Sequence, residues 1–214
     1  RVTADCHSAF ATQPAERRMA GEATHTHVYS ERALASIPKL PARGLFLLRE
    51  PASQIRSSYD YFRNNWTYIP ADLTFADYLA ATRYGTAAFG GNELAERPEE
   101  HADYMAWLDP WRAALGADRM KVTTFDRLKA DPQALMEEIA AWCGLSSGFF
   151  NGYDFPTENE SYQPRNRTLQ QLNVAVRAHL PGGRLYDGAR WLYRRMNTRK
   201  PDRTLADPSE AELR

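Results

Sequence analysis

The apolar positions along the chain predict strands that alternate with helices. A short apolar run at 44–48, after a turn with proline and glycine, indicates a buried strand, and 120–125 is a second run with the character of a strand. The first run is followed by helical spacing over 51–64, and the second by helical spacing over 131–144. Strands that alternate with helices in this way predict an α/β architecture with a parallel sheet.

Further helices follow from the same spacing rule. We expect them, in chain order, at 31–37, 74–82, 99–115, 168–180 and 185–196. Pro110 should kink or divide the third of these, since proline in a helix interior removes a hydrogen bond and clashes with the preceding turn. We expect one domain over 1–200, with a helix-rich C-terminal part, and a polar tail over 201–214.

Composition and charge exclude several classes of protein. Apolar residues make up 43% of the chain and charged residues 25%, which is typical of a globular protein. The net charge is zero, so a uniformly basic nucleic-acid binder is excluded and we expect no nucleic-acid partner. No run of eighteen apolar residues and no signal peptide is present, and Cys6 and Cys143 fit neither a disulfide framework nor a zinc site.

The junction between the first strand and its helix has the chemistry of an anion site. A buried strand runs into Arg49, and Pro51 suits the first position of a helix. Ligands of parallel α/β sheets bind beyond the carboxyl ends of strands, and a helix N-terminus offers free N–H groups. Arg49 adds a forked charge that matches phosphate oxygens, and Ser57 adds a hydroxyl. The alternative is a structural salt bridge between Arg49 and Glu50.

The full pattern at this junction resembles the 3′-phosphate-binding motif of sulfotransferases that use 3′-phosphoadenosine 5′-phosphosulfate (PAPS). That motif has a strand, Arg, Asp or Glu, Pro, then Ser eight residues after the Arg, often with Tyr two residues later. The matching residues here are Arg49, Glu50, Pro51, Ser57 and Tyr59, with Arg56 at another commonly basic position. The resemblance implies that Arg49 and Ser57 hold the 3′-phosphate of PAPS, and that Arg56 contributes.

The resemblance continues into the second strand-to-helix segment and covers roughly 24–145. Bacterial and Golgi-type sulfotransferases have a comparable order of helix, strand, Asp-Xaa-Leu turn, Asp-Pro helix start and Gly-Leu close, here within 104–145. The resemblance implies a P-loop NTPase-like fold, a parallel sheet flanked by helices. The family's 5′-phosphosulfate-binding loop has no counterpart in the sequence, and only two strong strands are visible. We therefore expect the domain to be incomplete at its N-terminus.

Two histidines precede the motif strand and are candidates for the catalytic base. Sulfuryl transfer needs a group that takes the acceptor's proton, and histidine suits that task near neutral pH. In an extended segment, His25 and His27 would point to the same side. The alternative is a surface pair without a role. Resemblance to uronyl and galactose sulfotransferases implies that His27 is the base and His25 supports it; Glu22 or Glu31 could substitute.

Two basic features follow the second half of the motif. Arg165 and Arg167 come after an aromatic loop, and the resemblance implies that either could touch the phosphate or an anionic acceptor. A solvated loop pair is the alternative. Further along, 184–203 carries seven basic residues. It could be a solvated helix face, or it could contact an acidic glycan or an anionic membrane.

Taken together, these patterns predict a sulfotransferase that moves a sulfuryl group from PAPS to a hydroxyl of a small molecule or glycan, most simply of a carbohydrate. We expect the reaction to need no metal ion. The alternatives are a non-catalytic nucleotide- or glycan-binding module of the same fold and another P-loop transferase, although a Walker A loop is missing. We expect a cytoplasmic location, or the Golgi lumen if a membrane anchor precedes the chain. The sequence leaves the acceptor and the oligomeric state open.

Overall fold

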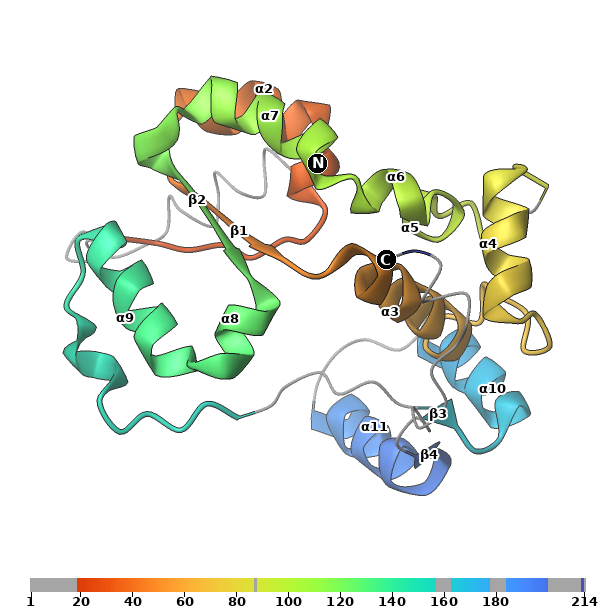
Figure 1. The fold of residues 1–214 in the computed structure, drawn as a ribbon. Coiled ribbons are helices and arrows are strands. Elements are labelled where there is room, and N and C mark those ends of the chain that lie inside the picture. Colours follow the sequence, from red (N-terminus) through yellow and green to blue (C-terminus); the bar gives the residue numbers. More distant parts are fainter. Residues whose placement is uncertain (1–18, 87, 157–162, 178–183, 200–212, 214) are drawn as a thin grey trace. The chain divides into compact units, whose positions relative to one another are not determined.

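A computed structural model describes residues 19–86, 88–156, 163–177, 184–199 and 213. These residues form two compact units, which we describe separately (Figure 1). Unit 1 contains the described residues up to Leu48 together with Asp103–Thr123. Unit 2 contains Arg49–Ala102 and the described residues from Thr124 onward. The expected single domain over 1–200 stays a prediction, and the expected tail over 201–214 lies outside the described residues except for Leu213.

Strands β1 (Gly44–Leu48) and β2 (Met120–Thr124) are hydrogen-bonded neighbours in a small parallel sheet. Both strands were predicted, and β2 ends one residue earlier than expected. Gly44 suits the start of β1, because an added Cβ would lie 2.9 Å from the side chains of Leu115 and Phe46, which would have to shift. Together with the helices, this sheet confirms the predicted α/β fold class.

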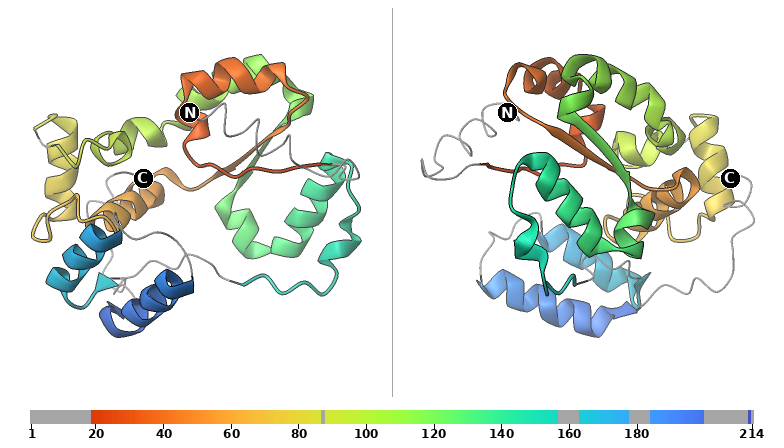
Figure 2. Two further views of the ribbon diagram at one scale, coloured as in Figure 1. Left: turned by 180° about the vertical axis from the view of Figure 1, so that it is seen from behind. Right: turned by 60° about the vertical axis from the view of Figure 1, so that its left-hand side comes forward.

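The core of unit 1 forms where helix α2 (Glu31–Ser36) packs against helix α7 (Tyr104–Leu115), which lie side by side in Figures 1 and 2. Trp111 is 3% exposed, and its indole N–H donates to the carbonyl of Val28 at 3.0 Å. Its ring lies 5.7 Å from that of Phe46 on β1. One buried aromatic residue thus links the helix to the strand that precedes the predicted anion site.

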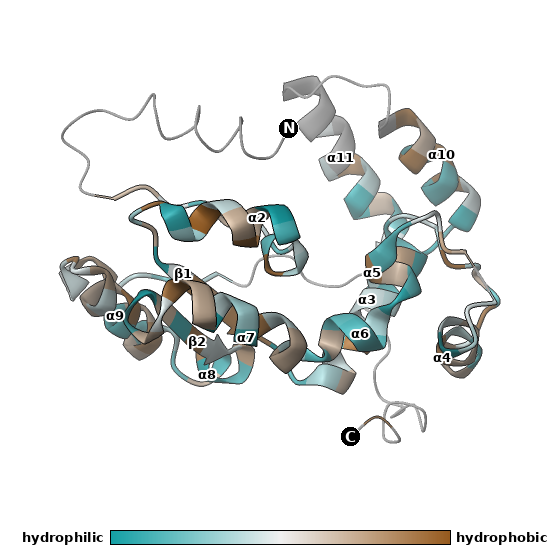
Figure 3. Cartoon of the chain, turned by 90° about the horizontal axis from the view of Figure 1, so that it is seen from above, coloured by the Kyte–Doolittle hydropathy of each residue, from teal (hydrophilic) through white to brown (hydrophobic). Residues whose placement is uncertain are grey.

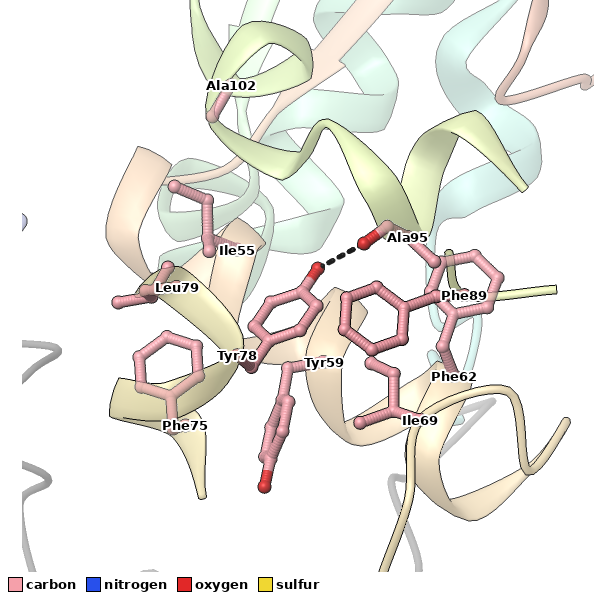
Figure 4. Close-up of a cluster of buried hydrophobic side chains, with 10 residues drawn as sticks. All are labelled: Ile55, Tyr59, Phe62, Ile69, Phe75, Tyr78, Leu79, Phe89, Ala95 and Ala102. Atoms are coloured by element: carbon pink, nitrogen blue, oxygen red, sulfur yellow. Dashed lines mark hydrogen bonds between the residues drawn. The ribbon is translucent and has the colours of Figure 1, made fainter. Parts of the chain in front are cut away.

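Helix α3 (Pro51–Asn64) carries the core of unit 2 and confirms the predicted helix. Its residues Ile55, Tyr59 and Phe62 are buried against α4 (Phe75–Arg83). Figure 4 shows this cluster, in which the Tyr78 hydroxyl donates to the carbonyl of Ala95. Tyr59, which matches the tyrosine of the sulfotransferase motif, is therefore a core residue.

The expected helix over 99–115 is two helices, α6 (Pro98–Ala102) and α7. The break falls at Asp103, whose backbone ψ of 77° is not helical, whereas the sequence predicted it at Pro110. The prediction failed because the chain passes from unit 2 to unit 1 between residues 102 and 103. Pro110 is exposed within α7. A short helix, α5 (Glu93–Glu96), precedes α6 and was not predicted.

Strand β2 leads directly into helix α8 (Phe125–Ala130), which the sequence did not predict, and then into α9 (Pro132–Cys143). The start and end of α9 are as predicted. The Asp131 carboxylate accepts from the N–H of Ala134 at 2.9 Å. Gly144 ends the helix with a φ of 72°, a left-handed conformation that glycine adopts without strain.

The last described helices, α10 (Arg167–Arg177) and α11 (Arg184–Asn197), were also predicted. Each is close to a short strand, β3 (Gln163–Pro164) or β4 (Thr198–Arg199), and the two strands pair in antiparallel fashion (Figure 1). Within the described residues, no helix combines the length and the apolar character needed to span a bilayer.

Candidate functional site

Arg49 directly follows β1 and precedes α3, at the junction that the sequence singled out. Its guanidinium carbon lies 5.6 Å from the centroid of the Phe125 ring. Within the part of the chain that the structure describes, Arg49 has no ion pair with a carboxylate. The structural salt bridge with Glu50, considered above as an alternative, is therefore absent, and the fixed charge of Arg49 is available to an anion.

Glu50 has a different partner, the start of α3. Its two carboxylate oxygens accept from the N–H groups of Ala52 at 3.1 Å and Ser53 at 2.8 Å. Pro51 has no N–H, and the N–H of Gln54 donates to the Glu50 carbonyl. The expectation that this helix N-terminus offers free N–H groups is wrong, because the acidic cap uses them. An anion at this junction must be held by side chains.

Ser57 is the side chain on α3 that could share such an anion with Arg49. It is partly buried on the second turn of the helix, one turn after Ser53 and on the same face. Among the described residues its hydroxyl has no hydrogen-bond partner. Both residues belong to unit 2. The predicted pair therefore consists of an unpaired guanidinium and a free hydroxyl around the start of one helix.

The sequence did not single out Phe125 or Lys129, which add to the surroundings of Arg49. Phe125 follows β2, and the carboxyl ends of adjacent parallel strands lie at the same edge of a sheet. The Nζ atom of Lys129 lies 4.6 Å from the centroid of the Phe125 ring and 3.7 Å from an Asp126 carboxylate oxygen. The position of Phe125 directly after the second strand is the sequence signal that could have identified it.

Arg56, another predicted donor-binding residue, contacts the aromatic core of unit 2. Its Nε atom lies 3.5 Å from a carboxylate oxygen of Asp60, whose side chain is 8% exposed. Its guanidinium carbon lies 5.0 Å from the centroid of the Phe75 ring and 5.6 Å from that of Tyr59. An anion would have to compete with these contacts for Arg56.

The two arginines after the aromatic loop differ from each other. Arg165 has an exposed side chain and uses its backbone N–H to bond the Asn197 carbonyl at 2.8 Å. Arg167 is partly buried and donates to the Ile69 carbonyl at 3.1 Å and to the Asn64 side chain at 3.4 Å. Burial and the nearby charge of Arg63 lower the pKa of Arg167. Arg167 holds α10 against the segment after α3, whereas Arg165 is free to meet an anion.

His25 and His27 lie in unit 1, and the expectation that they share one side of an extended segment is wrong. The chain turns there, with the His27 N–H donating to the Thr24 carbonyl at 3.4 Å, and a short 3₁₀ helix starts at His27. His25 is exposed, whereas the side chain of His27 is only 17% exposed. The turn therefore separates the two rings into different environments.

His27 has an acidic neighbour, Glu22. The Nδ1 atom of His27 lies 3.7 Å from a Glu22 carboxylate oxygen, within ion-pair range. The other Glu22 oxygen accepts from the Thr24 hydroxyl. Two of the candidate bases thus face each other, an arrangement in which a carboxylate can orient an imidazole ring. Glu31, the remaining candidate, is exposed in the first turn of α2.

No group of three or more His, Cys, Asp or Glu side chains that could hold a metal ion occurs within the described ranges. The candidate residues described above offer guanidinium, ammonium, hydroxyl and imidazole groups. Preorganised cationic and hydrogen-bonding groups of this kind stabilise charge in phosphoryl and sulfuryl groups.

Comparison with known proteins gives a likeness in fold. Neither the protein-family models nor the curated proteins include a match to this chain. A solved structure, a sulfotransferase from Alicyclobacillus acidocaldarius, matches with a TM-score of 0.58 and 20% sequence identity. The match covers 80% of this chain and 66% of that one, so the chain spans just under two thirds of the length of its structural neighbour. The chain therefore has a sulfotransferase-like α/β fold.

Proposed function

We propose that this chain is a sulfotransferase domain that takes PAPS as its sulfuryl donor and a hydroxyl of a carbohydrate as its acceptor. The proposal rests mainly on Arg49. Its guanidinium follows the first strand of a sulfotransferase-like fold and has no carboxylate partner among the described residues. The resemblance of residues 49–59 to the 3′-phosphate motif supports the choice of donor.

The donor's 3′-phosphate is assigned to side chains of unit 2. Arg49 supplies a planar fork of N–H donors and Ser57 supplies a hydroxyl. Arg165 is a further candidate because its side chain is exposed. Arg56 and Arg167 make contacts within unit 2 and would have to leave them in order to bind an anion. We therefore rank Arg49 and Ser57 first among the proposed donor-binding residues.

Proton removal from the acceptor is assigned to His27. With Glu22 on its Nδ1 side, the Nε2 atom of the ring is left to accept a proton. As the acceptor oxygen bonds to sulfur, the bond between sulfur and the bridging phosphate oxygen breaks, and adenosine 3′,5′-bisphosphate leaves. The acceptor's proton passes to His27, and the Glu22 carboxylate stabilises the resulting imidazolium.

Transfer of radiolabelled sulfate tests the function. The natural protein is incubated with [³⁵S]PAPS and a panel of neutral and acidic glycans, and the label in the glycan fraction is counted. We expect label in at least one glycan and none with Arg49→Ala. A protein that binds PAPS tightly and transfers no label, to glycans or to water, would contradict an enzymatic role.

A binding module without catalysis is the second candidate. It is favoured by the sequence, in which the 5′-phosphosulfate-binding loop of the family it resembles has no counterpart, whereas the residues of the 3′-phosphate motif are present. Binding of adenosine 3′,5′-bisphosphate without transfer would support this candidate. Dependence of transfer on His27 would exclude it.

A further inference from the structure

In the described part of helix α11, three large apolar side chains are exposed and a polar one is buried. Trp191, Leu192 and Met196 are 61%, 51% and 62% exposed, whereas Asn197 on the same helix is 2% exposed. A helix on the surface of a globular protein normally has the opposite arrangement. Large apolar side chains left in water indicate a surface that another apolar medium covers.

The buried side of α11 is held by hydrogen bonds. The Asn197 amide donates to the Tyr193 hydroxyl at 2.9 Å and to the Asn166 carbonyl at 3.0 Å. The Tyr193 hydroxyl in turn donates to Gln170, a fully buried residue of α10. Because buried hydrogen bonds of this kind leave few alternative arrangements, they fix which side of the helix faces outward.

Helix α10 has the same inverted arrangement. Leu169, Leu172 and Val176 are 39%, 60% and 42% exposed, while Gln170 is 0% exposed and donates to the Asn65 carbonyl at 3.0 Å. Figure 3 shows apolar and polar residues alternating along this helix. The two helices that attach to each other through polar side chains therefore both present apolar residues to the outside.

The charge on these helices points to an anionic partner. Their sequences contain a single acidic residue, Asp187, and six arginines: Arg167, Arg177, Arg184, Arg190, Arg194 and Arg195. The guanidinium carbon of Arg195 lies 5.6 Å from the centroid of the exposed Trp191 ring. An exposed tryptophan beside an arginine is typical of the water–lipid boundary, where the ring enters the apolar layer and the cation meets headgroups.

We propose that the outer face of α11, formed by Trp191, Leu192, Met196 and Arg195, binds the surface of a membrane that contains anionic lipid. Its apolar residues enter the headgroup–acyl boundary and its arginines pair with lipid phosphates and carboxylates, so the helix lies in the plane of the membrane. An acidic glycan would satisfy the arginines but would leave the tryptophan, leucine and methionine in water. The mutual repulsion of the arginines disfavours a second copy of the same face.

Vesicle co-sedimentation tests this surface. The protein is mixed with vesicles of phosphatidylcholine alone or of phosphatidylcholine with phosphatidylserine, at low and at physiological salt. We expect sedimentation with the mixed vesicles, weaker at higher salt. Met196→Asp should reduce the binding constant at least about tenfold, the effect of withdrawing one large apolar side chain from the lipid. Arg195→Gln should reduce it about fivefold.

Two variants on α7 serve as matched controls. Met105 is 55% exposed and Arg112 is exposed on the same helix, so Met105→Asp and Arg112→Gln make the same chemical changes elsewhere and should leave sedimentation unchanged. Circular dichroism and thermal melting establish that each variant is folded. Sedimentation of Met196→Asp equal to that of the unaltered protein would overturn the proposal. Binding to heparin, or self-association, without sedimentation of the protein with either kind of vesicle would also overturn it.

Discussion

The guanidinium carbon of Arg49 lies 5.6 Å from the centroid of the Phe125 ring, so residues that follow two neighbouring strands meet. A cation over an aromatic face is attracted by the ring's negative quadrupole, yet its N–H groups stay free at the guanidinium edge. The contact therefore holds Arg49 in place without using the donors that an anion needs. Phe125 is in this account a positioning residue for Arg49.

Replacement of Phe125 tests that role. Phe125→Leu should weaken binding of adenosine 3′,5′-bisphosphate by about two- to fivefold, since an exposed cation–π contact contributes about 0.5–1 kcal/mol. Phe125→Tyr keeps the ring and should restore the affinity. Titration calorimetry gives both values, and Phe149→Leu, which removes an exposed ring elsewhere in unit 2, is the control. Equal affinity in Phe125→Leu and the unaltered protein would argue against positioning.

Removal of the acidic cap on α3 should lower the stability of the protein without lowering its affinity for the ligand. Glu50→Ala leaves the N–H groups of Ala52 and Ser53 without their partner, so we expect the free energy of unfolding to fall by about 1 kcal/mol. Affinity for adenosine 3′,5′-bisphosphate should not fall, because those N–H groups become available to the anion. Urea unfolding and calorimetry measure the two quantities. A variant that keeps its stability and loses its affinity would contradict the capping role.

Arg56→Met distinguishes a structural from a donor-binding role for Arg56. It removes one partner of the buried Asp60 carboxylate and the cation over Phe75, so we expect the free energy of unfolding to fall by about 1 kcal/mol. Binding of adenosine 3′,5′-bisphosphate should change little at a temperature where the variant is folded. If affinity drops as far as in Arg49→Ala, Arg56 also contacts the donor.

The base assignment predicts a graded loss of transfer activity. His27→Ala should lower kcat by about 10²- to 10⁴-fold, the usual contribution of general acid–base catalysis. Glu22→Gln should lower kcat by less, because it removes only the carboxylate that faces Nδ1. His25→Ala tests the supporting role that the resemblance implies for the exposed His25, and it should lower kcat by less than His27→Ala. Full activity in His27→Ala would indicate that Glu22 or Glu31 is the catalytic base instead.

Alkaline pH should destabilise the protein through two tyrosines, Tyr78, which is buried, and Tyr29, which is partly buried. Burial, with a smaller contribution from Tyr104, raises the pKa of Tyr29 to about 12, and burial also raises the pKa of Tyr78. An unfolded tyrosine ionises near about pH 10, so unfolding releases protons above that pH. The free energy of unfolding should be flat below pH 10 and fall between pH 10 and about pH 12. Urea titrations of the unaltered protein and of Tyr29→Phe, which should show a shallower fall, test this.

The sequence predicted the strands and most helices because their signals are local. The apolar run at 44–48 and the proline at position 51 suffice to place β1 and the start of α3. The break at Asp103 was missed because it arises where the chain passes between two compact units, which no local pattern records. Helix α8 was missed because its first residue, Phe125, lies at the end of the predicted strand.

The candidate site was also predictable only where its signals are local in the sequence. The motif located Arg49 and Ser57, but the partners of Arg56 and Arg167 come from residues brought together by tertiary packing. The contact between Arg49 and Phe125 joins residues 76 positions apart and follows from strand pairing. The turn at His27 depends on backbone hydrogen bonds that the residue pattern did not reveal.

Calorimetric titration with adenosine 3′,5′-bisphosphate and with adenosine 5′-monophosphate tests the central claim most directly, because the two ligands differ only in the 3′-phosphate. We predict that the bisphosphate binds more tightly, and that Arg49→Ala removes this preference while Arg97→Ala, an exposed arginine of unit 2, keeps it. Equal affinity of the unaltered protein for both ligands, or a preference that survives in Arg49→Ala, would contradict the account.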